Sequence, residues 1–469
     1  MPINVRGGTR RDPLVGLAWE YSDTNVPWAY SSSTQSGREA EYFANWPAGW
    51  SSVPTIVDIQ TGGADFRTNV LNTIAANGRC IIRLGEGTYH LTSFVKAASD
   101  EMYAFGLWHT NLAGFVGQGA DKTIIQMDAG SMNATQLAGI ATLTSANVNN
   151  LHLMRLDGEA SSPAVLAGLT LQAQDQQTIA SFAAGNSIAG GQPAPHGGVL
   201  WYKRGVAANV YFYCSHVRAR GAGRACTSLP PFEHANFNSQ YEYGYYFNTE
   251  SDGRRAAELD AARPRRCGIV MGNNASVHSM VNCWLHHTNV SRYAMNDQNA
   301  TTSGAYAVAY CKVEHITDTQ NTDPALNGGA SLGGYTNATL LGWETCNGTI
   351  TVHHSILCQD NTVASGQTPC HFQMTTVGST RGTNGPQGGR LTAYDNVYRH
   401  AVSYLSGFLT CRIAAATYWY LDGYATTISS KPTAAGSAMT SWSYTTTRFA
   451  TSGEAAALDP STRYIVNQI

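Results

Sequence analysis

The amino-acid sequence predicts an all-β protein whose coils stack as a parallel solenoid, and composition gives the first reason. Charged residues make up 13% of the 469 residues, which is about half the usual share for a globular protein. The chain contains 47 glycines, and residues suited to strands and turns fill much of the rest. Short β-branched runs recur without long helices between them. This order argues against a doubly wound sheet.

A glycine-rich stretch, residues 114–128, resembles a phosphate-binding loop at first sight, with glycines at 114, 117 and 119. A Walker loop needs a lysine directly after its last glycine and a helix that starts there. Here Lys122 comes three residues after the last glycine, and the β-branched run 123–127 predicts a strand. Without a helix N-terminus the physical reason for binding an anion is missing. The stretch therefore predicts a tight corner that leads into a strand.

Charge and hydropathy limit the partners and the location. The net charge of −2 provides no basic field, so we expect no nucleic-acid partner. No apolar run approaches the ~18 residues of a membrane span. Residues 1–16 contain basic side chains but no apolar stretch behind them, so we expect no secretory signal and synthesis in a cytoplasm. The ten cysteines form no Cys-x-x-Cys pair, which predicts free, mostly buried thiols.

Strand-like runs return at loose intervals along the chain. They are residues 165–172, 210–219, 276–289, 307–318, 349–361 and 390–400. Several contain a small or thiol residue followed by an apolar one, namely Cys214, Cys283, Cys311 and Ser355. The 28 residues between Cys283 and Cys311 lie within the range of repeat architectures. We expect these side chains to stack as a ladder at the ~4.8 Å spacing of strands.

Residues 61–94 and 114–128 resemble the beginning of a right-handed parallel β-helix of the pectate-lyase-like type. The resemblance implies that Asp65 to Asn77 form a helix that caps the open end of the coil. It implies a first coil built from Ile81, Ile82, Leu84, Gly87, Thr88 and Tyr89, and a turn into the next coil at residues 117–123. The similarity covers about residues 55–420.

Within that fold, a chain that has an aromatic N-terminal segment and no signal peptide resembles bacteriophage tail spikes and minor tail proteins. This resemblance implies a component of the virion tail, a homotrimer, that recognises a polysaccharide on the host cell surface. It also implies contact with other tail proteins through the N-terminal segment. A free polysaccharide-degrading enzyme, either a lyase or a glycoside hydrolase, is the alternative.

The two ends differ in composition from the coil. Residues 1–54 contain four tryptophans among several tyrosines, which suits either a mount packed against another protein or a cover over the end of the solenoid. Residues 421–469 are rich in Ser and Thr. They suit a terminal layer of strands or an extended oligomerisation tail along a partner subunit.

Three long excursions, residues 226–267, 318–339 and 360–389, are expected to leave the coil and to wall one groove. The first is expected to contain a helix from Arg254, capped by Asp252. Three tyrosines of this excursion are candidates for sugar binding, because alternate positions of an extended segment share one face. They are Tyr241, Tyr243 and Tyr245. Packing of these rings onto the coil is the alternative.

Four carboxylates near strand ends are candidates for catalysis, since a glycosidase needs two carboxyl groups ~5–9.5 Å apart. They are Glu314, Asp318, Glu344 and Asp360. A lyase would instead need a base beside a group that neutralises a uronate, and His286 and His315 are expected to contact the substrate. The alternative is that all these groups are solvated or hydrogen-bonded corner residues. No metal or cofactor is expected.

Overall fold

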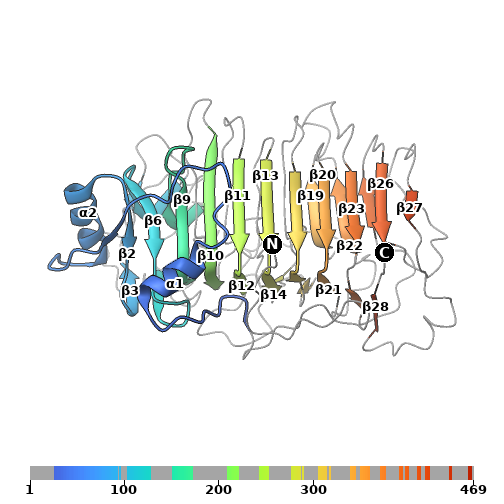
Figure 1. Cartoon of the computed structure of the whole chain (residues 1–469), viewed down its shortest axis with the longest axis horizontal. Helices are drawn as coiled ribbons and strands as arrows, with labels where there is room; N and C mark the ends of the chain where they lie inside the picture. The colour runs from blue at the N-terminus through green and yellow to red at the C-terminus, as the bar shows by residue number, and fades with distance from the viewer. Residues whose placement is uncertain are drawn as a thin grey trace, which may run out of the picture.

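The chain winds into coils that stack along one axis, with α2 at one end and β27 near the other (Figure 1). The computed structural model describes residues 26–92, 95–96, 103–127, 150–172, 209–220, 242–252, 276–286, 288–289, 305–313, 316–317, 339–344, 349–359, 370–375, 390–394, 397–400, 409–412, 418–422, 443–445 and 463–466.

One face of the coil is a ladder of parallel strands. In chain order it contains β1 (Ile56–Asp58), β2 (Cys80–Arg83), β6 (Leu112–Val116), β9 (Ala164–Gln172), β10 (Val210–Arg220), β11 (Glu242–Phe247), β13 (Ser276–Val281), β16 (Ala305–Ala309), β20 (Thr349–His353), β23 (Arg390–Tyr394), β26 (Tyr418–Asp422) and β27 (Ser443–Thr445). Each strand pairs with its equivalent in the next coil, for example β11 with β13 and β13 with β16.

A second face follows around a corner, and the long strands β9 and β10 continue into it. Its other strands are β3 (Gly87–Leu91), β7 (Thr123–Met127), β12 (Glu250–Asp252), β14 (Trp284–His286), β17 (Lys312–Val313), β21 (Ile356–Gln359) and β24 (Val397–His400), and β28 (Arg463–Val466) pairs antiparallel with the last of these.

Smaller sheets complete the described strands. They are β4 (Val95–Lys96), β5 (Tyr103–Trp108) and β8 (Asn150–Arg155); β15 (Thr288–Asn289) and β18 (Ile316–Thr317); and β19 (Thr339–Glu344), β22 (Cys370–Thr375) and β25 (Leu409–Arg412). The architecture is an all-β parallel β-helix, as the sequence predicts. Each of the six strand-like runs identified in the sequence overlaps at least one of these strands.

The predicted cap is present at the first coil. Helix α2 (Phe66–Asn77) begins after Asp65, whose side chain accepts a hydrogen bond from Thr68 N at 2.7 Å, and ends at Gly78 with φ 70°. Its buried face includes Phe66, whose ring lies 4.9 Å from that of Tyr89 in β3. The helix thus covers the apolar interior of the coil end.

Inside the coil, equivalent side chains of successive strands stack on one another. Phe115, Leu166, Cys214, Tyr246 and Met280 occupy one line of register through β6, β9, β10, β11 and β13, and all five are fully buried. The strands alternate inward and outward side chains, so this line forms the core and its neighbours face outward.

The corner between the two faces uses one backbone conformation in coil after coil. Its residue has positive φ at Gly168, His216, Asn248, Asn282, Tyr310 and His354, with values between 50° and 61°. The amide side chain of Asn282 donates to Asn248 Oδ1 at 2.6 Å, and Asn248 Nδ2 lies 3.1 Å from His216 Nε2. These bonds link three successive corners along the coil axis.

The predicted thiol ladder is confirmed in part. Cys283, Cys311 and Ser355 each follow a corner residue and are buried, and Cys311 N donates to Ser355 Oγ at 3.1 Å. The place given to Cys214 was wrong, because this residue lies within β10 in register with Tyr246. The four cysteines whose side chains are described are all free and buried, as expected.

The glycine-rich stretch forms the corner that its sequence predicts. Gly119, with φ of 146°, lies in this corner, and the strand β7 follows at Thr123. Gly114, with φ of 147°, lies just before the corner, within β6. A Cβ at Gly114 would lie 1.7 Å from the carbonyl oxygen of Val165 in the next coil, so glycine is needed for close approach of the two backbones.

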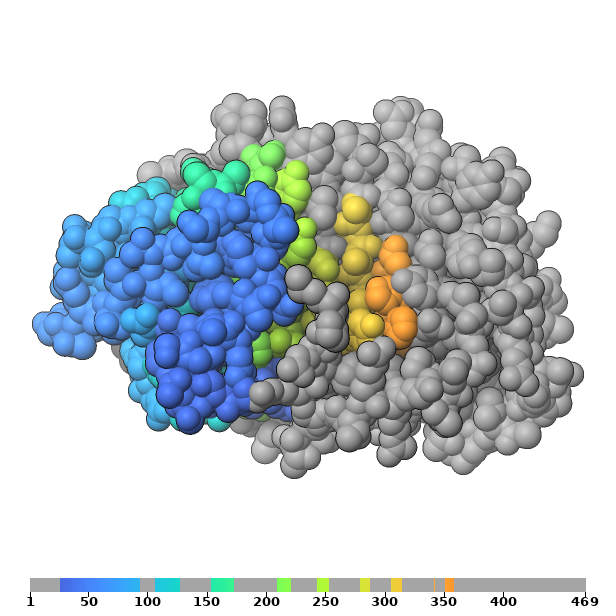
Figure 2. Space-filling view, in the orientation of Figure 1, coloured from blue at the N-terminus to red at the C-terminus, as the bar shows by residue number. Residues whose placement is uncertain are grey.

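The N-terminal segment packs along the side of the coil, over its outer face (Figures 1 and 2). Helix α1 (Gln35–Tyr42) brings the fully buried Tyr42 to the corner, where Tyr213 Oη donates to its carbonyl oxygen at 2.8 Å. The Trp46 ring lies 4.8 Å from the Tyr213 ring. Neither alternative for these aromatics anticipated this place, since α2 and not the aromatic segment covers the end.

The first expected excursion is shorter than the sequence suggested. Residues 242–247 and 250–252 are the strands β11 and β12 of the coil. Asp252 lies at the end of β12, and the helix expected from Arg254 falls outside the described residues.

In the C-terminal segment, β27 pairs with β26 and β28 pairs with β24. Within the described residues, no helix is long and apolar enough to cross a membrane.

Candidate functional site

Short strand β12 places two carboxylates on the outer face of the coil. Asn248 turns the chain at the corner, and Glu250 and Asp252 then alternate with Ser251. Ser251 lies in register with Ala219 and Leu285, two buried apolar residues of the second face, so it points inward. The two acids therefore point away from the core.

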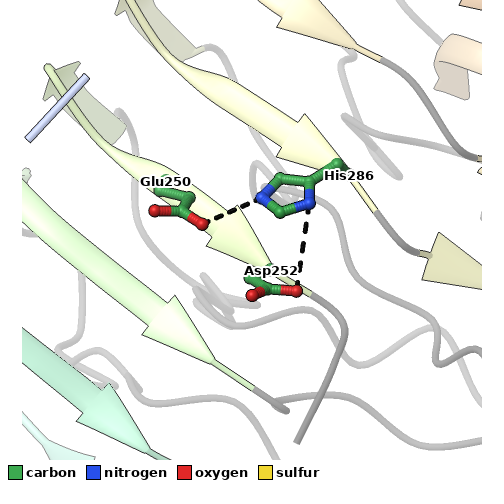
Figure 3. Close-up of side chains that lie close together, drawn as sticks. All are labelled: Glu250, Asp252 and His286. Carbon is green, nitrogen blue, oxygen red and sulfur yellow. Dashed lines mark hydrogen bonds and ion pairs between the residues drawn. The ribbon is translucent and has the colours of Figure 1, made fainter. Parts of the chain in front are cut away.

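His286 of β14 meets both carboxylates (Figure 3). Its Nε2 lies 2.9 Å from Glu250 Oε1, and its Nδ1 lies 3.9 Å from Asp252 Oδ1. None of these three side chains has solvent-exposed surface. Because an ionised carboxylate only accepts hydrogen bonds, Nε2 carries the hydrogen and donates it to Glu250.

Two arginines of β10, one coil earlier, supply the opposite charge. Arg218 lies 3.2 Å from Glu250 Oε1 and 3.1 Å from Asp252 Oδ2, and Arg220 Nε lies 3.5 Å from Asp252 Oδ2. Burial by itself would raise the pKa of Glu250, but the hydrogen bond from His286 and the charge of Arg218 outweigh it. The pKa of Glu250 is held below its usual value, so this buried acid is ionised at neutral pH.

We call Glu250, Asp252, His286, Arg218 and Arg220 the Glu250 cluster. Two indole rings lie against it. The Trp284 ring stacks on His286 with centroids 3.8 Å apart. The indole N–H of Trp28, from the N-terminal segment, donates to Glu250 Oε2. A carboxylate beside an imidazole, with cations and aromatic faces around them, can transfer protons and can bind a sugar through its hydroxyls and C–H faces.

The same side chains could also offer ligand atoms to a metal ion. One ligand atom each of Glu250, Asp252 and His286 lies within 4.8 Å of the others, as a divalent cation would need. However, Arg218 already contacts both carboxylates, so an added cation would have to displace it. The two arginines balance the two acids, and the cluster fits proton transfer and hydrogen bonding better than metal binding.

A second group of residues, the flank aromatic cluster, lies on the outer face of β10 and β11. It consists of Trp50, Tyr211, Tyr243 and Tyr245, all partly exposed. Tyr211 and Tyr243 stack at 4.5 Å and 15°, while Trp50 meets Tyr211 and Tyr245 edge-on at 5.0 and 5.2 Å. Tyr246, the residue after Tyr245, is fully buried and points into the core.

The structure describes some of the predicted site residues and leaves others outside. Tyr243 and Tyr245 share the outer face, as expected of an extended segment, and His286 is in the Glu250 cluster. Glu344 ends β19, where its backbone pairs with Thr375, in a different sheet from His286. Tyr241, Glu314, His315, Asp318 and Asp360 lie outside the described residues, so convergence of the predicted carboxylates stays a prediction.

The sequence pattern selects His286 but not its partners. Asp252 is expected only as a helix cap, and Glu250 and the two arginines of β10 are not among the predicted site residues. The signal that could have found them is the coil register, because Arg220, Asp252 and His286 occupy equivalent positions of three successive coils. That register becomes visible only once residues 242–252 are assigned to strands and not to a loop.

Comparisons with known proteins show neither a family nor a function for this chain. No protein-family profile matches the chain, and no curated protein sequence matches it. Among solved structures, the mannuronan C-5 epimerase AlgE4 A-module of Azotobacter vinelandii is similar, with 10% identity over 77% of this chain and 96% of that chain. The TM-score of 0.27 is low, and no activity is inferred from this likeness.

Proposed function

We propose that this chain is a bacteriophage tail component, a tail spike or minor tail protein, that binds a polysaccharide on the host cell surface. The observation that carries the proposal is the flank aromatic cluster. Sugars present apolar C–H faces and polar rims, and rings that stay partly exposed on a β-sheet face suit them. Trp50 and Tyr245, in contact at 5.2 Å, provide ring surface from two separate parts of the chain.

The protein would act in the virion as a homotrimer, joined to other tail proteins through its N-terminal segment. From Val26 onward that segment packs on its own coil, so we assign the contact with other tail proteins to residues 1–25. Closed symmetry would also protect the exposed faces of the coils from open-ended association. Light scattering should therefore give three chains per particle, and a stable monomer at micromolar concentration would contradict the assembly.

Polysaccharide cleavage, in the virion or as a free enzyme, is the second candidate function, and one observation favours it. Glu250 and His286 lie 2.9 Å apart with Arg218 beside them. This arrangement offers a proton donor, a proton acceptor and a cation in one place, which acid–base catalysis requires. It would need access to the buried cluster.

Binding is tested with immobilised bacterial surface polysaccharides and purified Tyr243→Ala and Tyr245→Ala proteins. Each ring should contribute ~1 kcal/mol, so each variant should bind its polysaccharide several-fold more weakly. Tyr30→Ala is a matched control, because Tyr30 is also partly exposed and lies outside the cluster, near Asp121. Unchanged affinity in Tyr243→Ala and Tyr245→Ala proteins that melt normally would place binding elsewhere.

A further inference from the structure

The Glu250 cluster lies on the outer side of the coil, yet the side chains of Glu250, Asp252 and His286 at its centre are fully buried. Along the outer line of the second face, Arg218, Glu250, Trp284 and Lys312 occupy equivalent positions, and the Lys312 ammonium lies 5.7 Å from the Trp284 ring. Side chains on the outside of a coil are ordinarily in contact with water. In this part of the coil, residues from the N-terminal segment lie over them.

The covering residues form one tight turn. Ala29 N donates to the carbonyl oxygen of Val26 at 3.3 Å, and Pro27 sits at the position of such a turn that favours proline. The turn directs Trp28 at the cluster, where its indole N–H donates to Glu250 and its ring lies 5.9 Å from the Arg218 guanidinium. Val26 packs against Trp284.

The rest of the segment is held on the coil by other contacts. Arg38 donates to Ser33 O at 2.8 Å and contacts Gln118, which fixes the start of α1. Tyr42 is buried at the corner and bonded to Tyr213. The turn could therefore lift from the cluster while α1 and the residues after it stay in place.

We propose that Trp28 occupies a sugar subsite, and that the turn Val26–Ala29 is a displaceable cover over an acid–base site formed by the Glu250 cluster. The inference rests on the polysaccharide binding proposed above. The indole N–H takes the place of a sugar hydroxyl that donates to the Glu250 carboxylate. Its flat ring takes the place of a pyranose ring beside the Arg218 guanidinium and the Trp284 indole.

One buried hydrogen-bond donor of the Glu250 cluster has no acceptor, which is what a site for a polar ligand would show. Among the described residues, Arg218 Nε is buried and has no hydrogen-bond acceptor, although the terminal nitrogen of the same side chain contacts Glu250 and Asp252. A buried donor without an acceptor is unfavourable, and an indole ring cannot provide one. A pyranose hydroxyl, which donates and accepts, could bond to Glu250 and Arg218 at once.

The cover is tested without any sugar, by labelling histidines with diethyl pyrocarbonate and mapping the peptides by mass spectrometry. In the unaltered protein His286 should react at least ~10-fold more slowly than the exposed His90, because reaction requires local opening. In Trp28→Ala the two rates should approach each other. Tyr30→Ala, a change in the same segment, should leave His286 protected.

Two results would overturn the cover. His286 could stay protected in a Trp28→Ala protein that keeps its β-sheet signal in circular dichroism, or it could become reactive in Tyr30→Ala as well. If Trp28→Ala does not fold, hydrogen exchange of the unaltered protein decides. The Ala29 amide should exchange at least ~10-fold faster than the Phe43 amide, and equal rates would exclude a displaceable turn.

The subsite is tested separately, with the polysaccharide that the immobilised panel identifies. Oligosaccharides of that polysaccharide should slow the labelling of His286 in Trp28→Ala and should bind this variant several-fold more tightly than the unaltered protein. If His286 opens but no oligosaccharide protects it, the cover stands and the sugar subsite is wrong. If Tyr243→Ala also binds normally, the failure lies with the proposed binding function and not with the cover.

Discussion

Replacing Glu250 with alanine tests whether the Glu250 cluster is held together as an ion-pair network. The change leaves Arg218 with Asp252 alone, removes the acceptor of His286 Nε2 and leaves the Trp28 N–H without its carboxylate. Removing one partner of a buried ion pair destabilises a protein by about 3–5 kcal/mol. Since the Arg218 side chain keeps 19% of its exposure, water can hydrate part of its charge, and we expect a loss near the lower end of that range.

The assay is equilibrium unfolding in guanidinium chloride, followed by circular dichroism and by tryptophan fluorescence. Two probes are needed because the coils of a solenoid can unfold separately. Glu250→Gln keeps an acceptor for Trp28 and should lose less stability than Glu250→Ala. As a control, Glu86→Ala removes an exposed acid that lies 2.7 Å from Lys122, and it should leave the unfolding midpoint unchanged. A loss below about 1 kcal/mol for Glu250→Ala, the size found for exposed pairs, would refute the network.

Three further properties follow from the fold. Burial lowers the pKa of His216 to about 4, so the stability that its neutral form provides is present above pH 6.5 and is lost, by about 3 kcal/mol, as the pH falls towards 4. His216→Asn should flatten the dependence of the unfolding free energy on pH in this range. An unchanged dependence would contradict the assignment. Gly114→Ala should prevent soluble expression or lower the melting temperature sharply, whereas Gly85→Ala, whose added Cβ would meet its nearest neighbour at 3.6 Å, should melt like the parent. Far-ultraviolet circular dichroism should show mostly strand, and helix above about a third would contradict the solenoid.

The fold could be predicted from the sequence because its strongest signals are local. The Asp65 cap, the apolar pair Ile81 and Ile82, and the glycine corner each determine their own surroundings through capping, burial and backbone freedom. The aromatic stretch at Tyr243 was harder, because alternating tyrosines around a glycine suit a loop and a strand equally well. Its assignment to β11 depends on pairing with β10 and β13, which is a non-local property.

The Glu250 cluster was out of reach for the same reason. His286 could be selected as a titratable residue at a strand end, but its partners lie in the two preceding coils and at Trp28, which is more than 200 residues away in sequence. Spacing cannot reveal such a contact when the lengths of the coils differ. The placement of Trp28 over Glu250 depends on the path of the N-terminal segment along the coil, and no pattern in that segment specifies the path.

The repeated corner also bears on how such a chain can vary. Successive corner residues are as close as 28 residues, from Asn282 to Tyr310, and as far apart as 48, from Gly168 to His216, yet the strands on either side keep their register. Extra length is therefore absorbed outside the corner, and the entropy of closing a longer loop grows only slowly with its length. Longer segments between corners can therefore be accommodated without a change in the register that stacks each coil on the one before it.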